Sequence, residues 1–203
     1  MRHCRKHRTH RNSFEIALFG AACVGKTSLV RRSFYGEFNH EYTPTVEDYY
    51  RHEIHRNGGV TVLDATDCAG SFQFPAMRQV TIRRAAGIVL VFSLDSEFSF
   101  RELQRILDEI IAAKAEEGVP IVIVGNKKDL NVREVREEDI TELIRMNSSD
   151  KFQLRYVETS AKDSANVDEV FDQLLRLLMP EPPLKKSKIK VFNFKAKEKC
   201  SIM

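Results

Sequence analysis

The sequence predicts an α/β fold in three layers, with a mixed six-stranded sheet and about five helices. Short β-rich runs alternate with longer stretches of helical periodicity, which is typical of a parallel sheet covered by helices on both faces. A glycine-bearing turn, Gly20–Thr27, follows the first β-rich run and leads into a helical pattern. Two β-rich runs are separated only by Arg56–Gly59, a hairpin signal that puts one antiparallel strand at the sheet edge.

The strands are predicted from short runs of β-branched, aromatic and aliphatic residues bounded by turn residues. In chain order they are Phe14–Phe19, Val46–His55, Gly59–Ala65, Gly87–Ser93, Val119–Gly125 and Gln153–Glu158. Helical periodicity is clearest at Phe100–Glu116, Arg136–Met146 and Val167–Met179. We interpret the apolar stripes of these helices as core. A PEPP run after Met179 ends the last helix and the folded domain together.

Length and composition indicate one folded domain with two basic tails. The chain has 203 residues, 42% of them apolar, and its apolar runs are far shorter than the roughly 20 residues that span a bilayer. Residues 1–13 carry +5 and residues 185–203 carry +6, so residues 14–184 carry −8. No apolar run follows the basic N-terminus, so we expect no secretory signal and a cytosolic chain with its four cysteines free.

The turn GAACVGKT matches the phosphate-binding pattern G-x-x-x-x-G-K-[ST] between a strand and a helix. This pattern arises by chance in on the order of 1% of chains this long, and its placement makes chance less probable still. Its backbone amides are expected to face phosphate oxygens, the Lys26 ammonium to reach the β- and γ-phosphates, and the Thr27 hydroxyl to bind Mg²⁺. The predicted phosphate-binding residues are Gly20, Ala21, Ala22, Cys23, Val24, Gly25, Lys26, Thr27 and Ser28.

Two later motifs predict a guanine pocket. NKKD, Asn126–Asp129, follows the predicted strand Val119–Gly125 directly. The carboxylate of Asp129 can accept both N1–H and the exocyclic amine of guanine, and adenine lacks that pair of donors. Asn126 is expected to support the loop and the base edge, and the stem of Lys127 to cover one face of the base. In TSAK, the residues Ser160, Ala161 and Lys162 are predicted to bind the base, with the Ala161 amide on guanine O6.

A D-x-x-G pattern supplies the predicted γ-phosphate sensor. Asp67 ends a strand beside the phosphate loop and is expected to hold Mg²⁺ through water, while the Gly70 amide binds the γ-phosphate. Thr45 completes the magnesium shell and also senses the γ-phosphate. Loss of that phosphate releases both segments, which is a switch. We predict Thr27, Thr45 and Asp67 as metal ligands and Lys26, Thr45, Gly70 and Ser71 as the catalytic set, without a convincing general base.

Together these motifs resemble the Ras family of small GTPases over roughly Phe14–Met179 and the last four residues, and GSFQFPAMR looks most like its Di-Ras and Ras-dva branch. The resemblance implies a P-loop G domain over residues 14–180, GTP, GDP and Mg²⁺ as ligands, a monomer, and an exchange factor. Phe38 matches the aromatic that packs on guanine. The implied effector region, which pairs with basic effector domains by strand addition, is Tyr42, Thr43, Pro44, Thr45, Val46, Glu47, Asp48, Tyr49 and Tyr50.

Two positions depart from the usual Ras pattern, and both bear on hydrolysis. Ala22 stands where the family has a second loop glycine, so its methyl intrudes near the γ-phosphate. Ser71 stands in place of the water-orienting glutamine and is too short to reach the attacking water. We therefore predict slow hydrolysis and a bias to the GTP-bound state, with compensation by neighbouring residues as the alternative. A Rap-type activating protein that brings its own asparagine fits a chain lacking this glutamine.

The sequences of the tails predict that the chain associates with a membrane. The ending CSIM fits a C-a-a-X box, so a prenyltransferase is expected to farnesylate Cys200. Seven lysines in Lys185–Lys199 supply the second signal that one lipid chain needs, by attraction to anionic lipids of the plasma membrane. A nuclear or nucleic-acid role is the alternative for this tract. The N-terminal arm, with His3, His7 and His10, is read as a second anionic-surface contact or a localisation signal rather than a metal site.

Three rival interpretations remain open at this point. A P-loop kinase or ATPase would share the phosphate loop, but it would not need Asn126, Asp129 and the Ser160–Lys162 segment. A scaffold that stays bound to GTP is favoured by Ala22 and Ser71. A nucleic-acid-binding module would use the basic tails, but it leaves the core motifs unexplained, so no nucleic-acid partner is expected. We interpret Cys23 and Cys68 as small filling residues, with a redox sensor as the alternative.

Overall fold

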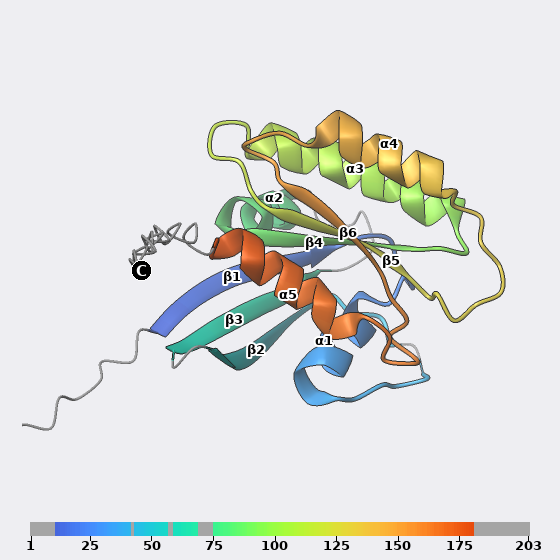
Figure 1. Ribbon diagram of the computed structural model, residues 1–203, viewed down its shortest axis with the longest axis horizontal. Helices are drawn as coiled ribbons and strands as arrows, with labels where there is room; N and C mark the ends of the chain where they lie inside the picture. Colours follow the sequence, from blue (N-terminus) through green and yellow to red (C-terminus); the bar gives the residue numbers. More distant parts are fainter. Residues whose placement is uncertain (1–10, 42, 57–58, 69–74, 181–203) are drawn as a thin grey trace, which may run out of the picture.

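The computed structural model describes residues 11–41, 43–56, 59–68 and 75–180, and these form a sheet between two layers of helices (Figure 1). The sheet has the strand order β2-β3-β1-β4-β5-β6. Its strands are β1 (Arg11–Phe19), β2 (Glu47–Arg56), β3 (Gly59–Cys68), β4 (Gly87–Ser93), β5 (Ile121–Asn126) and β6 (Leu154–Glu158). Only the β2–β3 pair is antiparallel among these strands. The predicted mixed sheet of six strands with an antiparallel edge is therefore confirmed.

Five helices in the described part of the chain cover both faces of the sheet, as predicted. They are α1 (Lys26–Tyr35), α2 (Pro75–Arg84), α3 (Glu97–Ala113), α4 (Glu137–Asn147) and α5 (Val167–Leu178). Helices α1 and α5 lie on one face, and α2, α3 and α4 on the other (Figure 1). Each face has its own apolar cluster. Leu29, Val170 and Leu174 belong to one cluster, and Ile82, Leu103 and Ile140 to the other.

Burial explains which boundaries the sequence predicted well. All seven residues of β4 are buried, so its continuous apolar run had a clear start and end, and its predicted bounds are confirmed. Strand β1 instead begins at Arg11, three residues before the predicted start and inside the predicted N-terminal extension. Arg11 pairs with Val60 and Ser13 with Val62, so backbone pairing rather than apolar side chains extends this strand.

The observed helix ends differ from the predicted ones because capping contacts, and not the periodicity of apolar residues, determine where a helix begins and ends. Helix α3 begins at Glu97 rather than Phe100, because the Ser96 hydroxyl accepts a hydrogen bond from the Ser99 amide and caps the first turn. It ends at Ala113 rather than Glu116. The range of α2 was not predicted, since its described residues bury only Ile82 and show little apolar periodicity.

The topology gathers the loops that carry the predicted motifs. Strand β1 lies between β3 and β4. After β1 the chain adds β2 and β3 on one side of this strand, and it then crosses over to add β4, β5 and β6 on the other side. This is the switch point at which open α/β sheets bind ligands, outside the carboxyl ends of the strands. The loops after β1, β5 and β6 all leave from those ends.

Candidate functional site

A cavity of about 380 Å³ lies at this edge of the sheet, within the size range of small-ligand sites. The predicted site residues that line it are Ala22, Cys23, Gly25, Lys26, Thr27, Ser28, Phe38, Thr43, Thr45, Asn126, Lys127, Asp129, Ala161 and Lys162. Gly20, Ala21, Val24, Asp67 and Ser160 are buried and do not belong to this lining. Tyr42, Gly70, Ser71 and Cys200 fall outside the described residues.

The glycines of the first loop are required by backbone geometry. Gly20 has a φ of 144°, and a Cβ there would lie 2.0 Å from the Val91 carbonyl oxygen on β4. Gly25, with φ 95°, would place a Cβ 2.3 Å from the Asn126 amide nitrogen. Cys23 adopts φ 61° although it has a side chain. The loop is thus closely applied to β4 and β5, and Ala22 and Cys23 are exposed at its tip.

Lys26 is buried beneath this loop. Its Nζ donates to the carbonyl oxygens of Gly20, at 3.0 Å, and Ala21, at 2.8 Å. Burial lowers the pKa of Lys26, and the nearby Asp67 carboxylate counters that shift. A cation held at the first turn of α1 suits an anionic ligand such as a phosphate chain.

Three oxygen-bearing side chains converge beside Lys26. The Thr27 hydroxyl donates to Asp67 Oδ2 and lies 3.1 Å from the Thr45 hydroxyl, which therefore donates to it. Asp67 is fully buried, and its Oδ1 has no hydrogen-bond partner among the described residues. Burial raises the pKa of Asp67, although the Thr27 hydrogen bond and the Lys26 charge oppose this.

Hydroxyl and carboxylate oxygens with one unused acceptor fit Mg²⁺. This ion is usually held by one or two carboxylates together with waters and substrate phosphates. A cage of several acidic or imidazole ligands is not needed, and none occurs among the described residues. The donor set Thr27, Thr45 and Asp67 is the predicted one, and the structure brings all three together.

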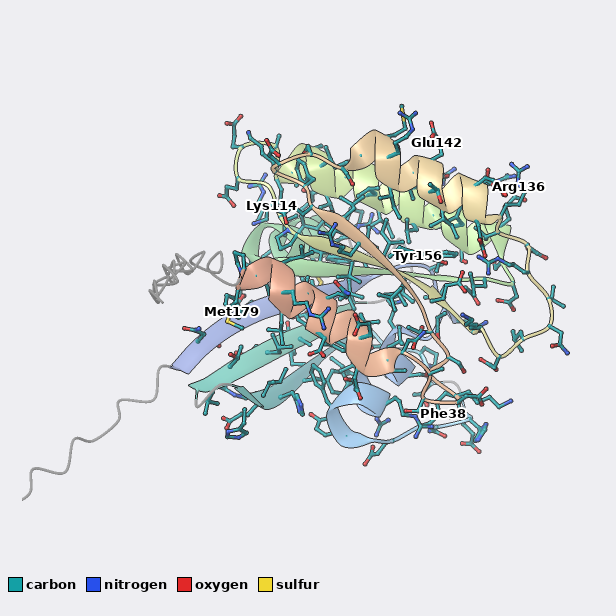
Figure 2. The ribbon with its side chains drawn as sticks, in the orientation of Figure 1. Phe38, Lys114, Arg136, Glu142, Tyr156 and Met179 are labelled. Carbon is teal, nitrogen blue, oxygen red and sulfur yellow. The ribbon has the colours of Figure 1, made fainter. Side chains whose placement is uncertain are left out.

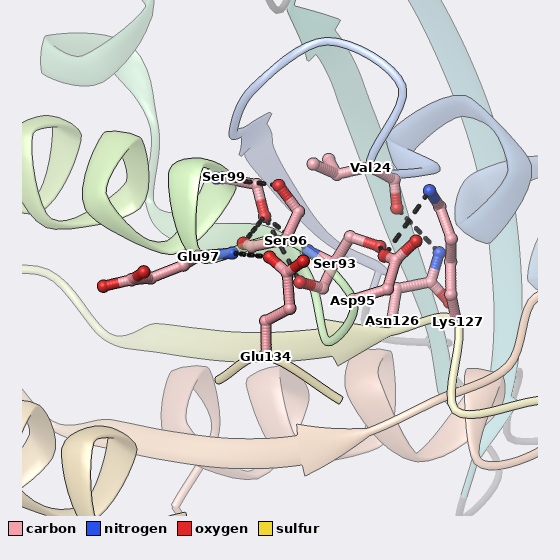
Figure 3. A network of polar contacts seen from close by, with 9 residues as sticks. All are labelled: Val24, Ser93, Asp95, Ser96, Glu97, Ser99, Asn126, Lys127 and Glu134. Carbon is pink, nitrogen blue, oxygen red and sulfur yellow. Dashed lines mark hydrogen bonds and ion pairs between the residues drawn. The ribbon is translucent and has the colours of Figure 1, made fainter. Parts of the chain in front are cut away.

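Asn126 joins the first loop to the loops after β5 and β6. Its Nδ2 donates to the Val24 carbonyl at 2.8 Å, as Figure 3 shows, and its Oδ1 accepts from the Thr159 hydroxyl at 3.0 Å. The Ala161 amide also donates to Asn126 Oδ1, at 3.2 Å. The expected contact of the Ala161 amide with guanine O6 stays a prediction; in the structure the buried Asn126 oxygen holds this amide.

Asp129 lines the cavity, and a neighbouring hydroxyl holds its carboxylate in place. The Ser160 hydroxyl donates to Asp129 Oδ1 at 2.7 Å, and the Ser160 oxygen accepts from the Asp163 amide at 3.0 Å. A half-buried carboxylate fixed in this way can accept a pair of adjacent N–H donors. The amino and N1–H groups of guanine are such a pair.

The first residue after Asn126 is bent into an unusual conformation. Lys127 has φ 64°, and its Nζ lies 3.7 Å from Asp95 Oδ1, which also accepts from the Ser93 hydroxyl (Figure 3). The left-handed backbone turns the chain sharply, so the stem of Lys127 lies along the cavity wall. This is the position predicted for a side chain that covers a planar ring.

Phe38 supplies an aromatic side chain to the cavity wall. It is half-buried, packs against the apolar cluster of α1 and α5, and lies edge to face with His40 at 5.0 Å. Figure 2 places Phe38 close to the start of α5, whereas Met179 lies at the other end of that helix. The chain after Met179 therefore continues from the end of α5 remote from the cavity.

The predicted effector region reaches from the cavity to the sheet edge. Thr43 and Pro44 are exposed, and Thr45 is half-buried beside Thr27. Val46 lies outside β2, which begins at Glu47, so the predicted strand start was one residue early. On β2, Asp48 and Tyr49 are exposed, while Glu47 and Tyr50 are half-buried. The Tyr49 hydroxyl donates to Glu47 Oε2 at 2.7 Å.

Sequence reasoning missed several residues of the cavity wall. Arg31, His40 and Leu130 line it without belonging to any motif. Only their closeness in the sequence to Phe38 or Asp129 could have suggested that they line the cavity. Cys68 also lines the cavity, and burial raises its pKa to about 12, which disfavours the reactive thiolate and hence the redox alternative for this residue.

Within the described ranges, no helix is both long and apolar enough to cross a membrane.

Comparison with known proteins gives one consistent result. Residues 15–179 match the model of the Ras family. The chain is 40% identical to GTP-binding protein Di-Ras2 of Pongo abelii over 199 residues, which cover 95% of this chain and 98% of the relative. It is also 40% identical to GTP-binding protein Di-Ras1 of Homo sapiens over 82% of each chain. The chain therefore belongs to the Ras family of GTP-binding switch proteins, in its Di-Ras branch.

Proposed function

We propose that this chain binds GTP and GDP with Mg²⁺, hydrolyses GTP slowly, and signals from a membrane mainly in the GTP-bound state. The observation that carries the proposal is the cluster of Thr27, Thr45 and Asp67 beside buried Lys26, with Asp67 Oδ1 unpartnered. Bound Mg²⁺ would supply charge neutralisation on the phosphate chain. Lys26 would bind the β- and γ-phosphates, and the Thr27 and Thr45 hydroxyls would position the ion.

Guanine selectivity is assigned to Asp129. Its carboxylate would accept N1–H and the exocyclic amine, while Phe38 and the stems of Lys127 and Lys162 enclose the ring. Asn126 would support the site by joining the loops after β5 and β6 to the phosphate loop, through its contacts with Val24 and Ala161. Adenine would leave the carboxylate without donors, which costs several kcal/mol in a dry site.

Slow hydrolysis is proposed from two residues. The Ala22 methyl is exposed at the tip of the phosphate loop, where a γ-phosphate and any incoming arginine would approach. Ser71, in place of glutamine, lacks the reach to orient water. Ras itself hydrolyses GTP unassisted at roughly 10⁻⁴ s⁻¹, and we expect a lower rate here. A Rap-type activating protein that inserts an asparagine would compensate for Ser71.

A scaffold that holds GTP without measurable turnover is the second candidate, favoured by the same Ala22 and Ser71. Single-turnover hydrolysis separates the two. A slow but finite rate that rises about tenfold in Ser71→Gln and again in Ala22→Gly supports the switch. No turnover in the wild type over many hours supports the scaffold, and a wild-type rate equal to that of Ras contradicts the proposal of slow hydrolysis.

Partners are proposed from the two exposed regions of the chain. Among the described strands, β2 pairs only with β3, so its other edge, which carries Glu47 and Asp48, can accept a strand from a basic effector domain. A guanine-nucleotide exchange factor would open the magnesium side of the cavity. The lysine tract Lys185–Lys199 and a farnesylated Cys200 would together hold the chain on anionic lipid, each lysine adding about 1 kcal/mol.

The direct test is nucleotide competition on the purified chain. Fluorescent GDP should bind in the presence of Mg²⁺ and be displaced by GDP or GTP, but not by a thousandfold excess of ADP or ATP. Displacement by ATP at equal concentration would instead support a P-loop kinase or ATPase. Absence of any nucleotide binding would contradict the proposal as a whole.

A further inference from the structure

Arg32, in the last turn of α1, connects three segments of the cavity wall although it does not line the cavity itself. Its Nε donates to the Ala161 carbonyl at 3.0 Å, and its Nη2 donates to the Lys162 carbonyl, also at 3.0 Å. Its Nη1 donates to the Gly36 carbonyl at 2.9 Å. One guanidinium thus spans from α1 to a loop about 130 residues later in the chain.

The same guanidinium lies against the aromatic wall. Its Cζ is 5.4 Å from the centroid of the Phe38 ring, a cation–π distance. Gly36, with φ 72°, ends α1 and turns the chain toward Phe38. Arg32 therefore contacts the start of the segment that carries Phe38 as well as Phe38 itself.

The chemistry of arginine suits these three carbonyl contacts. Its planar fork offers five donors in fixed directions and stays charged at any relevant pH, whereas a lysine ammonium is a point charge that cannot reach three separated carbonyls. Charge-assisted hydrogen bonds are about twice as strong as neutral ones. The fork therefore fixes the spacing between the Ala161–Lys162 backbone and Phe38.

Arg32 is separate from the phosphate end of α1. Lys26 and Thr27 are in the first turn, and Arg32 follows Lys26 by six residues, roughly 9 Å along the helix axis. Its contacts with Ala161, Lys162 and Phe38 go to segments proposed to enclose the guanine ring, and its contact with Gly36 lies two residues before Phe38. A change at Arg32 should therefore act on base retention and leave the phosphate chemistry unaltered.

We propose that Arg32 is a positioning residue that sets how long the guanine nucleotide stays bound, by holding the Ala161–Lys162 backbone and Phe38 at the spacing of the base. This rests on the proposed function. Arg32→Ala should release GDP about tenfold faster, which corresponds to about 1.4 kcal/mol. Arg32→Gln should approach Arg32→Ala, and Arg32→Lys, which keeps the charge near Phe38, should release GDP about threefold faster.

The experiment measures release of fluorescent GDP, the preference for GDP over ADP, and single-turnover hydrolysis of bound GTP. For Arg32→Ala we expect faster release, a GDP preference reduced about tenfold, and a hydrolysis rate within twofold of wild type. Arg145→Ala is the matched control, because Arg145 makes two hydrogen bonds to Glu142 on the exposed face of α4. It should release GDP at the wild-type rate.

The outcomes separate this inference from the proposed function. A wild type that binds no GDP overturns both. A wild type that binds GDP, with Arg32→Ala releasing it at the wild-type rate, overturns only the role of Arg32. Faster release with an unchanged GDP preference and a lower unfolding temperature also overturns it, because that pattern is general loosening. If Arg32→Ala does not fold, the same comparisons in Arg32→Lys and Arg32→Gln decide the matter.

Discussion

The two ends of the cavity differ in how their polar groups are satisfied. At the guanine end, formed by Asn126–Asp129 and Thr159–Lys162, both atoms of the Asn126 amide are hydrogen bonded and Asp129 accepts from Ser160. At the magnesium end, formed by Thr27, Thr45 and Asp67, the buried Asp67 Oδ1 has no partner among the described residues. The Asn126 amide at the guanine end is thus satisfied within the protein, whereas the buried Asp67 carboxylate at the magnesium end keeps an acceptor without a partner in the described part of the chain.

The same contrast holds for the backbone around each end. The guanine end follows directly from β5 and β6, and the Thr159 amide donates to the Gly125 carbonyl at 2.9 Å between them. Residues 37–46 form no helix or strand in their described part, and most of their described side chains are exposed. The loops proposed to bind the edge of the base are therefore anchored to the sheet, whereas the segment 37–46, which carries Phe38, has few buried side chains and is suited to change with the nucleotide.

The largest expected effect comes from Asp129→Asn at the guanine end. An amide offers one acceptor and one donor, so it loses the pairing with guanine and gains one with the 2-oxo group of xanthine. GDP affinity should fall by about 10² to 10⁴-fold and xanthosine diphosphate affinity should rise. Competition against fluorescent GDP measures both. Asp150→Asn, at an exposed aspartate, is the control, and an unchanged GDP affinity in Asp129→Asn would remove Asp129 from the base site.

The next effect tests the magnesium end alone. Asp67→Asn keeps the shape of the side chain but removes the charge that an ion needs, so chelation of Mg²⁺ should no longer speed GDP release. In the wild type we expect chelation to speed release by tens of fold. Asp64→Asn, three residues earlier on β3 and paired with Arg51 at 3.7 Å, should respond like the wild type. Equal chelator responses in Asp67→Asn and the wild type would show that Asp67 does not hold the ion.

Gly25→Ala tests the link between the ends. Its methyl would lie 2.3 Å from the Asn126 amide nitrogen at φ 95°, so both the clash and the backbone strain act there. We expect GDP to bind about tenfold more weakly and the free energy of unfolding to fall by about 1–3 kcal/mol. Gly36→Ala has a similar φ of 72° with nothing within 4 Å of the new methyl. Equal losses in both variants would mean that strain alone, and not contact with Asn126, matters.

The sequence predicted those features that depend on local pattern. Strand β4 was predicted to the residue because all of it is buried. The convergence of Thr27 and Asp67 followed from motifs near the ends of the parallel strands β1 and β3, which deliver their loops to one edge, and Thr45 precedes the antiparallel β2, which starts at that same edge. The Arg32 contacts with Ala161 and Lys162 join residues about 130 positions apart in the sequence, and no local sequence pattern predicts such a pair.

The differences between predicted and observed element ends have the same physical cause. The start of β1 depends on backbone pairing with β3, and polar residues such as Asn12 and Ser13 give no apolar signal for it. The hydrogen bond from the Ala161 amide to the buried Asn126 oxygen, at 3.2 Å, joins residues 35 apart and likewise has no local signal in the sequence. Both are tertiary effects that compete with local preference.

The smallest expected effect concerns the stability of the guanine end at low pH. Glu158 Oε1 accepts from Arg133 at 2.7 Å and from the Tyr156 hydroxyl at 2.9 Å, and Lys128 lies 3.3 Å from its Oε2. Burial pushes the pKa of Glu158 upward, but the hydrogen bonds outweigh it, so the pKa lies below 4.5. A lowered carboxyl pKa stabilises the fold above the unfolded value, and that contribution is lost as the pH falls through the folded value.

Glu158→Gln should therefore lower the free energy of unfolding by at most about 1 kcal/mol at neutral pH, because the partners are partly exposed. The difference from wild type should shrink as the pH falls below 4.5. Urea unfolding at saturating GDP and several pH values measures it. Glu142→Gln, whose carboxylate pairs with exposed Arg145 on α4, should show a smaller difference at every pH. A Glu158→Gln difference that stays constant into acid would mean that packing, and not the carboxylate charge, connects the guanine loops here.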